Sequence, residues 1–403
     1  MSRTINLSQL LNRPLKIAVL LDAALSSHCK IMRGISAFIE EHQLPWNVVL
    51  NHELSMERKD ILSLHFDGII ANFSNPKHLR RLEKVDLPVV GLLNGLDHVQ
   101  ADQIQHPFVT IDNQRLIQLC YDHLRKNGLD NIAYYGLKSD DKAWHQCRSH
   151  HYQYLQKRHR QATQIYIGEK ASFSSWSSEI EQLKNWVEGL KKPVGIIVSS
   201  DARARTLIGL CEENHIMVPD EVAIISIGDA SLSEFFQHTS LSVVEPGYEE
   251  LGYTCANLLN QQLKQQPVPK KTFVEPETIT ARESTKHRGL QDSYLLRAVH
   301  YIRNHAHLGI KSAQVVEFAG CSRTFLEELF RDQVGHTIHK EIHHVKFEKV
   351  KHLLIHTQLS IPDIAQKTGY PSHQYLYSLF QRELGVTPNQ YRLQIPKSEI
   401  IAK

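Results

Sequence analysis

The sequence predicts an α/β part built on parallel sheets, followed by an all-α part that contains two helix-turn-helix motifs. Two observations carry this prediction. Over residues 16–284, strand-like apolar runs alternate with amphipathic helical stretches, which is typical of doubly wound parallel sheets. Over roughly residues 292–393 the apolar periodicity is helical only, and a pattern of helix, glycine turn and helix occurs twice.

The first half of the α/β part is predicted to consist of strands separated by helices. KIAVLLDA has the continuous apolar character of a buried strand, and the stretch after it has apolar residues at helical spacing. The expected strands are 16–23, 46–53, 66–73 and 88–94. The expected helices are 27–42, 56–64 and 76–85.

The second half repeats this alternation. Residues 108–138 contain a strand, an Asp-Asn pair, a long helix, an Asn-Gly turn and another strand. The further elements expected are helices at 144–159 and 178–190, a strand at 163–167, two strands and a helix within 194–230, a strand and a helix within 241–263, and an extended segment at 271–284. We therefore expect domains at 1–286 and 294–403, joined by a linker at 287–293.

The segment 360–392 contains a complete helix-turn-helix pattern. Ser360 is a candidate N-cap, with proline and aspartate in the first turn. Gly369 ends the first helix, and the second begins near Ser372. Residues 312–337 repeat the pattern. Either copy alone could be an ordinary helical hairpin, but two copies in about a hundred residues form a far more specific signal.

Together with GVTPNQYR after the second copy, the pair resembles the DNA-binding domain of AraC-type transcription factors. The resemblance implies that the leading ends of both second helices meet base edges of double-stranded DNA. The residues predicted to bind DNA are Ser322, Arg323, Thr324, Glu327, Ser372, His373, Gln374 and Tyr377. Two positions depart from the family, because Lys346 replaces a usual arginine and Glu328 a common basic residue.

The charge distribution agrees with DNA binding by the second part. The whole chain has a formal net charge of +3. Residues 286–403 contain about 16 basic and about 10 acidic residues, a net charge of about +6, so the remainder carries about −3. A basic surplus in the helical part is what phosphate binding requires.

Several function classes lack sequence support. No GxSxG elbow, P-loop or GxGxxG fingerprint occurs, so no enzymatic activity is expected. The 25 histidines include no HExxH pattern, and neither a metal site nor a cofactor is expected. The six cysteines show no CxxC spacing, and no signal peptide or membrane span is predicted. These features favour a cytoplasmic protein with reduced thiols.

The first part resembles the ligand domain of LacI/GalR regulators and periplasmic sugar-binding proteins. The matching segments are DN…HL…G…IA…G at 112–136, SSDARA at 199–204, VPDEVAIISIGD at 218–229 and VEPETITARES at 274–284. The resemblance implies a two-lobed periplasmic-binding-protein-like sensor, with a sugar held at the carboxyl ends of the strands of both lobes.

Polar residues at strand ends and on the helix at 144–159 supply the candidate sugar ligands. They are Asp22, Asn94, Trp144, Arg148, Asp201 and Asp229. The resemblance singles out Arg148 and Asp201 as ligands of sugar hydroxyls. Trp144 could equally stack on a sugar or pack in the core, and a strand-end acid could instead cap the next helix; we expect Asp112 to be such a cap.

One position near this site departs from the family pattern. Many relatives have an acidic residue directly after the strand VAIISI, whereas this chain has Gly228 and then Asp229. Two alternatives follow from this difference. Either Asp229 takes the acidic role through a shifted turn, or one hydroxyl contact is lost.

The two resemblances together imply a sugar-responsive transcription activator. A sensor placed ahead of an AraC-type domain resembles a group of pentose-responsive activators, which implies D-xylose as effector and the operons of xylose catabolism and transport as targets. The expected partners are operator half-sites, RNA polymerase and a second copy of the chain, with no membrane. The alternative is a sugar-binding or transport-associated protein whose C-terminal helices mediate protein contacts.

Overall fold

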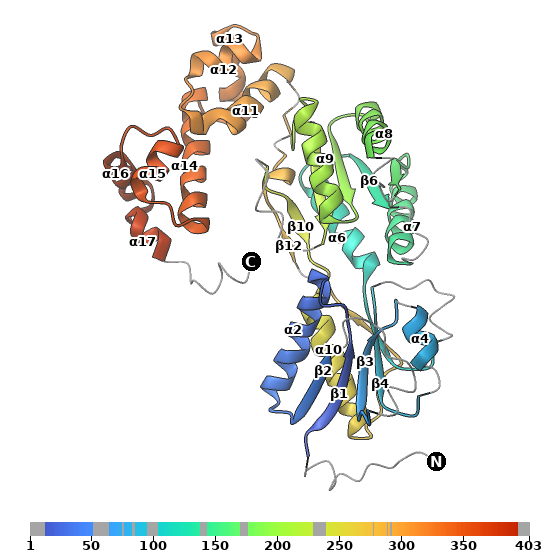
Figure 1. The fold of residues 1–403 in the computed structure, drawn as a ribbon. Coiled ribbons are helices and arrows are strands. Elements are labelled where there is room, and N and C mark those ends of the chain that lie inside the picture. The colour runs from blue at the N-terminus through green and yellow to red at the C-terminus, as the bar shows by residue number, and fades with distance from the viewer. Residues whose placement is uncertain are drawn as a thin grey trace.

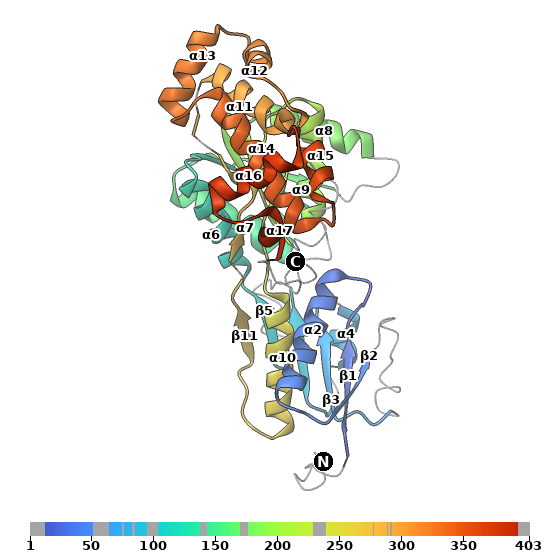
Figure 2. The same cartoon turned by 90° about the vertical axis from the view of Figure 1, so that its left-hand side faces the viewer.

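The structure is a computed structural model, and it describes residues 13–50, 64–74, 76–82, 85–94, 104–137, 143–169, 176–228, 239–276, 278–287, 289–290 and 292–393. It consists of two α/β lobes and a helical part that lies beside the second lobe (Figures 1 and 2). The predicted fold class is confirmed. Residues 56–63 of the helix expected at 56–64, and the candidate ligand Asp229, lie outside the described residues.

The first lobe is built on a parallel sheet with strand order β11-β5-β4-β3-β1-β2. Its strands carry continuous apolar runs because helices cover both faces of the sheet. The strands are β1 (Leu15–Leu20), β2 (Trp46–Leu50), β3 (Gly68–Asn72), β4 (Val89–Leu93), β5 (Phe108–Ile111) and β11 (Lys271–Val274). The helices are α2 (Ser26–Glu41), α4 (Pro76–Leu82) and α10 (Tyr248–Leu263).

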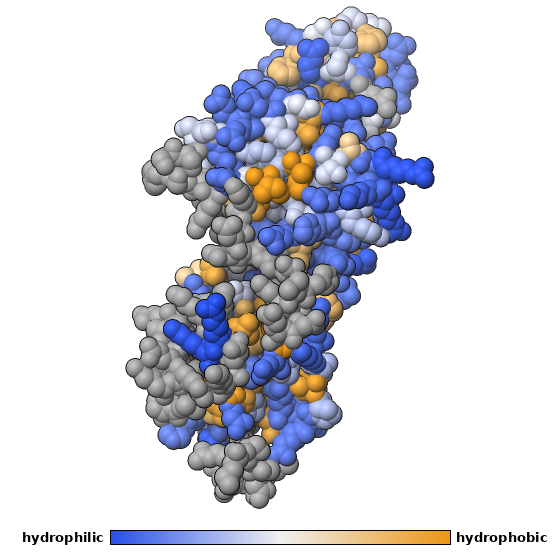
Figure 3. All heavy atoms as spheres, turned by 90° about the vertical axis from the view of Figure 1, so that its right-hand side faces the viewer, coloured by the Kyte–Doolittle hydropathy of each residue, from blue (hydrophilic) through white to orange (hydrophobic). Residues whose placement is uncertain are grey.

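The second lobe has the strand order β12-β10-β9-β8-β6-β7, in which only the β10–β12 pair is antiparallel. Its strands are β6 (Asn131–Leu137), β7 (Ile165–Gly168), β8 (Val194–Val198), β9 (Val222–Ile227), β10 (Ser242–Val244) and β12 (Ile279–Thr280). Its helices are α6 (Asn113–Lys126), α7 (Ala143–Arg158), α8 (Trp176–Gly189), α9 (Asp201–Glu213) and the short η2 (Glu283–Thr285). Figure 3 shows that the side carrying α7 and α8 is largely hydrophilic, as solvent-facing helices require.

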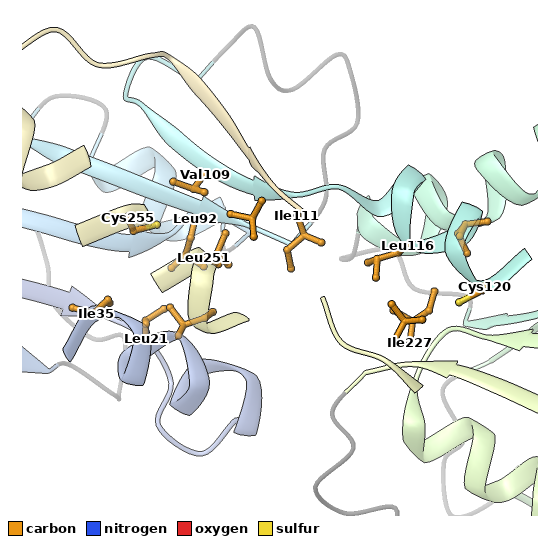
Figure 4. Close-up of a cluster of buried hydrophobic side chains, with 14 of the residues drawn as sticks. Leu21, Ile35, Leu92, Val109, Ile111, Leu116, Cys120, Ile227, Leu251 and Cys255 are labelled. Atoms are coloured by element: carbon orange, nitrogen blue, oxygen red, sulfur yellow. The ribbon is translucent and has the colours of Figure 1, made fainter. Parts of the chain in front are cut away.

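The chain crosses between the lobes three times, from β5 to α6, from β10 to α10 and from β11 to β12. Each crossing leaves the carboxyl end of a strand, so the carboxyl ends of both sheets point toward the junction. The segment 271–284, expected as one extended stretch, is in fact divided between the two sheets. One apolar core continues across the junction, with Ile111 between Leu92 of the first lobe and Leu116 of the second (Figure 4).

Helices α2 and α10 cross at two glycines in the first lobe. A Cβ atom on Gly34 would lie 1.9 Å from the carbonyl oxygen of Glu249, and one on Gly252 would lie 1.9 Å from that of Ile31. Both obstacles are backbone atoms of a packed helix, which cannot move aside as a flexible side chain can. The two helices therefore approach each other only because both positions lack a side chain.

We expect Gly252→Ala to destabilise the protein by about 3 kcal/mol or more, since overpacking against backbone forces the helices apart. Gly209→Ala is the matched control, because a Cβ there meets no atom within 4 Å in the interior of α9. That change should be neutral or stabilise by about 0.5–1 kcal/mol. Thermal unfolding of the full chain compares the variants, and an unchanged midpoint for Gly252→Ala would contradict the close approach.

The helical part contains two small cores joined by one helix. Its elements are α11 (Ser293–His305), η3 (Ala306–Leu308), α12 (Ser312–Ala319), α13 (Arg323–Leu329), η4 (Phe330–Val334), α14 (Ile338–His356), α15 (Ile361–Lys367), α16 (His373–Leu384) and α17 (Pro388–Leu393). Helix α14 contributes Ile338 and Ile342 to the first core, and Phe347, Val350 and Leu354 to the second. Each core therefore belongs to one helix-turn-helix unit, and α14 holds both.

Candidate functional site

Four residues form a hydrogen-bonded chain across the junction of the two lobes. The amide Nδ2 of Asn113, at the start of α6, donates to the carbonyl oxygen of Asn94 at 2.7 Å, directly after β4. Arg148 of α7 donates from Nε to Asn113 Oδ1 at 2.7 Å and from Nη1 to the carbonyl oxygen of Ser199 at 2.9 Å, directly after β8. We call Asn94, Asn113, Arg148 and Ser199 the junction chain. It links the carboxyl ends of strands in both sheets.

Arg148 is the central residue of the junction chain. It is 3% exposed, and burial lowers the pKa of its guanidinium below the ordinary arginine value. The guanidinium carbon lies 4.3 Å from the centre of the Trp144 ring, so the predicted pair of Trp144 and Arg148 does come together. Among the described residues no carboxylate forms an ion pair with Arg148, and its Nη2 makes no hydrogen bond. Two donor hydrogens therefore remain for a ligand oxygen.

Asn94, another member of the junction chain, supplies a side-chain acceptor. Its Oδ1 is buried and has no hydrogen-bond partner among the described residues. Leaving a buried acceptor unsatisfied costs about 1–3 kcal/mol, which a ligand hydroxyl would recover. Each hydroxyl of a sugar can both donate and accept a hydrogen bond. A donor on Arg148 and an acceptor on Asn94, joined through Asn113, therefore suit a polyhydroxyl ligand.

Asp201 is the first residue of α9, so its carboxylate lies at the helix N-terminus, where negative charge is favoured. Its Oδ1 accepts a hydrogen bond from Ser226 Oγ at 2.6 Å. The structure gives a reason why a glycine, and not an acidic residue, stands at position 228. A Cβ on Gly228 would lie 2.7 Å from the Asp201 carboxylate, so a larger residue at position 228 would collide with this group.

Asp22 stabilises the turn in which it lies, at the end of β1. Its Oδ1 accepts a hydrogen bond from the backbone nitrogen of Ala24 at 2.9 Å, and its backbone nitrogen donates to His28 Nδ1 at 3.0 Å. It is thus held at the carboxyl edge of the first sheet by local bonds. No described contact joins it to the junction chain.

The sequence prediction missed Asn113 and Ser199. Both lie within two residues of a strand end, and this position is a signal that could have found them. The neighbouring Asp112 caps α6 as expected, because its Oδ1 accepts a hydrogen bond from the backbone nitrogen of Arg115 at 2.9 Å. Tyr248, at the start of α10, lies near enough to Arg148 to raise the pKa of the guanidinium, against the larger opposite effect of burial.

Helices α13 and α16 are the second helices of the two helix-turn-helix units, and their leading ends face solvent. The exposed side chains at these ends are Arg323, Thr324, His373 and Gln374. Ser322 and Ser372 cap the helices, accepting hydrogen bonds from the backbone nitrogens of Phe325 at 3.3 Å and Tyr375 at 3.2 Å. Glu327 is half-buried. Tyr377 packs at the edge of the second core, and its hydroxyl accepts a hydrogen bond from Asn389.

Lys346 supports the turn of the second unit. Its Nζ donates to the carbonyl oxygen of Gly369 at 2.7 Å and lies 4.2 Å from the centre of the Tyr370 ring. Burial lowers the pKa of this amine. Gly369 has a φ of 66°, and a Cβ on it would lie 2.8 Å from the backbone nitrogen of Gly309. The lysine that departs from the family pattern thus braces the turn between α15 and α16.

Two further observations concern metal sites and membrane-spanning helices in the described part of the chain. No group of three or more His, Cys, Asp or Glu side chains within them is placed to hold a metal ion. None of the helices that the structure describes combines the length and apolar character needed to cross a membrane.

Comparisons with known proteins match three parts of the chain. Residues 16–114 match the XylR N-terminal domain family, residues 121–285 the periplasmic binding protein-like domain family, and residues 315–394 a helix-turn-helix domain family. Together these matches cover both lobes and both helix-turn-helix units.

Individual relatives are similar over almost the full length. The xylose operon regulatory protein of Escherichia coli (strain K12) is 34% identical over 379 residues, covering 94% of this chain and 96% of the relative. Its namesake in Haemophilus influenzae is 35% identical over 381 residues, covering 94% and 98%. A solved structure of the xylose-binding transcription activator xylR superimposes with a TM-score of 0.84 at 33% identity, covering 94% of this chain and 98% of that chain.

Proposed function

The chain belongs to the family of xylose operon regulatory proteins and is a sugar-responsive transcription activator, and on this premise we propose that its effector is D-xylose. The observation that carries the proposal is the junction chain. It presents donors on Arg148 and a buried acceptor on Asn94 at the carboxyl ends of both sheets. A pentose with adjacent hydroxyls is a ligand of suitable chemistry.

Sugar binding acts in this proposal by selecting one arrangement of the lobes. Arg148 belongs to the second lobe and Asn94 to the first, so a sugar held by both stabilises the arrangement that brings them together. Asp201, at the start of α9, adds a charged acceptor for another hydroxyl. Trp144 packs against the guanidinium and restricts its orientation. Asp22 and Asp229 remain candidate ligands on the evidence of the sequence pattern.

DNA binding is assigned to the helical part. We propose that Arg323 and Thr324 of α13, and His373 and Gln374 of α16, read base edges in successive major grooves. Glu327 and Tyr377 lie further along the same helices, where they flank the contact surface. The serine caps contribute by fixing the helix starts. The proposal also includes a homodimer on paired half-sites, contact with RNA polymerase and residence in the cytoplasm.

The test combines sugar calorimetry with DNA titration on the full chain. We expect heat of binding with D-xylose, weaker binding of L-arabinose and D-ribose, and an affinity for operator DNA that depends on xylose and falls steeply with salt. Binding of a hexose but of no pentose would overturn the xylose assignment. Xylose binding without any DNA affinity at low salt would favour the rival transport-associated protein.

A further inference from the structure

The segment that leads into the helical part is anchored on the second lobe. Thr285 accepts hydrogen bonds there from Asn127 Nδ2 to its carbonyl oxygen at 2.8 Å, and its Oγ1 lies 2.9 Å from His123 Nε2. The adjacent Ser284 is buried and donates from Oγ to the carbonyl oxygen of Ile224 at 2.6 Å. His287 Nδ1 lies 3.3 Å from the carbonyl oxygen of Asn127. This segment is therefore fixed at the C-terminal end of α6.

A second attachment joins α11 to the same lobe. Arg303 Nη1 forms an ion pair with Asp220, which lies shortly before β9. The Asp220 side chain is fully buried and that of Arg303 is 13% exposed. Burial, helped by the charges of Arg303, His305 and His215, lowers the pKa of His300 to about 4. His300 is thus neutral at pH 7, and Arg303 supplies the positive charge that faces Asp220.

Both attachments are connected by a helix to the junction chain or its neighbour Asp201. Helix α6 begins at Asn113 and ends beside the anchor of Thr285, and α9 begins at Asp201 and is followed by the turn that holds Asp220. At about 1.5 Å per residue, helices of 14 and 13 residues span roughly 20 Å. The candidate sugar site and the two attachments of the helical part therefore lie at opposite ends of the same two helices.

We propose that Asp220 and Arg303 are positioning residues that, with the anchored segment 284–287, mount the DNA-binding domain rigidly on the second lobe. The domain then moves with this lobe as one body when a sugar changes its orientation relative to the first lobe. This inference rests on the proposed function, and it specifies which lobe carries the DNA-binding domain and through which side chains.

The test uses the full-length double variant Asp220→Asn/Arg303→Gln, which removes both charges of the ion pair together. The affinity for D-xylose should stay within about twofold of the unmodified protein, because the sugar site is untouched. The ratio of DNA affinities with and without xylose, roughly 5–150-fold in coupled systems, should fall to within about twofold of one. The single variant Arg303→Lys keeps the positive charge at this position. It should therefore retain part of the affinity ratio that the double variant loses.

Arg297→Gln is the matched control, since it removes the same charge from an exposed position of α11. It should leave the ratio unchanged. If the double variant keeps the full ratio of DNA affinities with and without xylose, the proposal is overturned. An equal loss in Arg297→Gln also overturns it, because the effect would then come from the net charge of α11.

A sugar-free measurement separates this proposal from the proposed function. Spin labels carried by non-natural residues at the exposed positions Gln182 of α8 and Lys349 of α14 report the distance between the second lobe and the DNA-binding domain. The distribution should be narrow in the unmodified protein and broad in the double variant. Equal widths overturn the rigid mount even if xylose binds, whereas a broadened distribution supports the mount even if the effector is a different sugar.

Discussion

Replacing Arg148 by methionine should raise the dissociation constant for D-xylose by about a hundredfold or more, which corresponds to about 2.7 kcal/mol. The guanidinium is buried, and two of its nitrogens are committed to Asn113 and Ser199. Each hydrogen bond from a charged group contributes about 1.5–3 kcal/mol. The substitution removes the donors offered to the sugar and also releases Asn113, so both halves of the junction chain lose their alignment.

Two further variants distinguish this role from general damage. Arg158→Met removes a charge from the last turn of the same helix and should leave xylose binding unchanged. Arg148→Lys keeps the charge but loses the planar fork, so its affinity should stay well below that of the unmodified protein. Calorimetry gives the affinities, and thermal unfolding checks the fold. Normal xylose affinity in a folded Arg148→Met variant would remove Arg148 from the sugar site.

Replacing Asp201 by alanine should raise the dissociation constant for xylose by about tenfold or more, since a charged acceptor on a hydroxyl contributes roughly 1.5–3 kcal/mol. Asp201→Asn should have a smaller effect because the amide keeps an acceptor that Ser226 can reach. Ser200, not Asp201, is the residue at the N-cap. The loss should therefore arise mainly from ligand contact.

Glu213→Ala is the control for this prediction, because it removes an exposed carboxylate from the other end of α9. Its xylose affinity should equal that of the unmodified protein. Calorimetry with D-xylose, L-arabinose and D-ribose measures all three variants. If Asp201→Ala folds and binds xylose normally, the carboxylate is not a ligand of the sugar.

Local patterns predicted the elements well because their signals are short in range. The apolar run that became β1 and the serine cap of α15 each depend on a few neighbouring residues, and Ser360 does accept from the backbone nitrogen of Asp363 at 3.3 Å. The segment 271–284 was harder to predict. Its two strands lie in different sheets, and partners far away in the sequence, Phe108 and Val243, determine that division.

The candidate site was predictable only in part for the same reason. Trp144 and Arg148 are four residues apart on one helix, so their contact follows from helical geometry. The bonds from Arg148 to Asn113 and Ser199 join residues 35 and 51 positions apart, and no local pattern encodes them. The hydrogen bond that the Tyr377 hydroxyl accepts from Asn389 was likewise not predictable, because Asn389 belongs to the following helix.

The sharing of α14 between two cores has a consequence for the DNA that the chain can recognise. A continuous helix of 19 residues spans about 28 Å, and it cannot stretch or bend without breaking one of the two cores. The distance and the rotation between the two helix-turn-helix units are thus fixed. A turn of B-DNA takes about 10.5 base pairs, so an insertion of about five between the two recognised subsites rotates one of them to the opposite side of the duplex. We therefore expect operators for this protein to vary in sequence far more easily than in spacing.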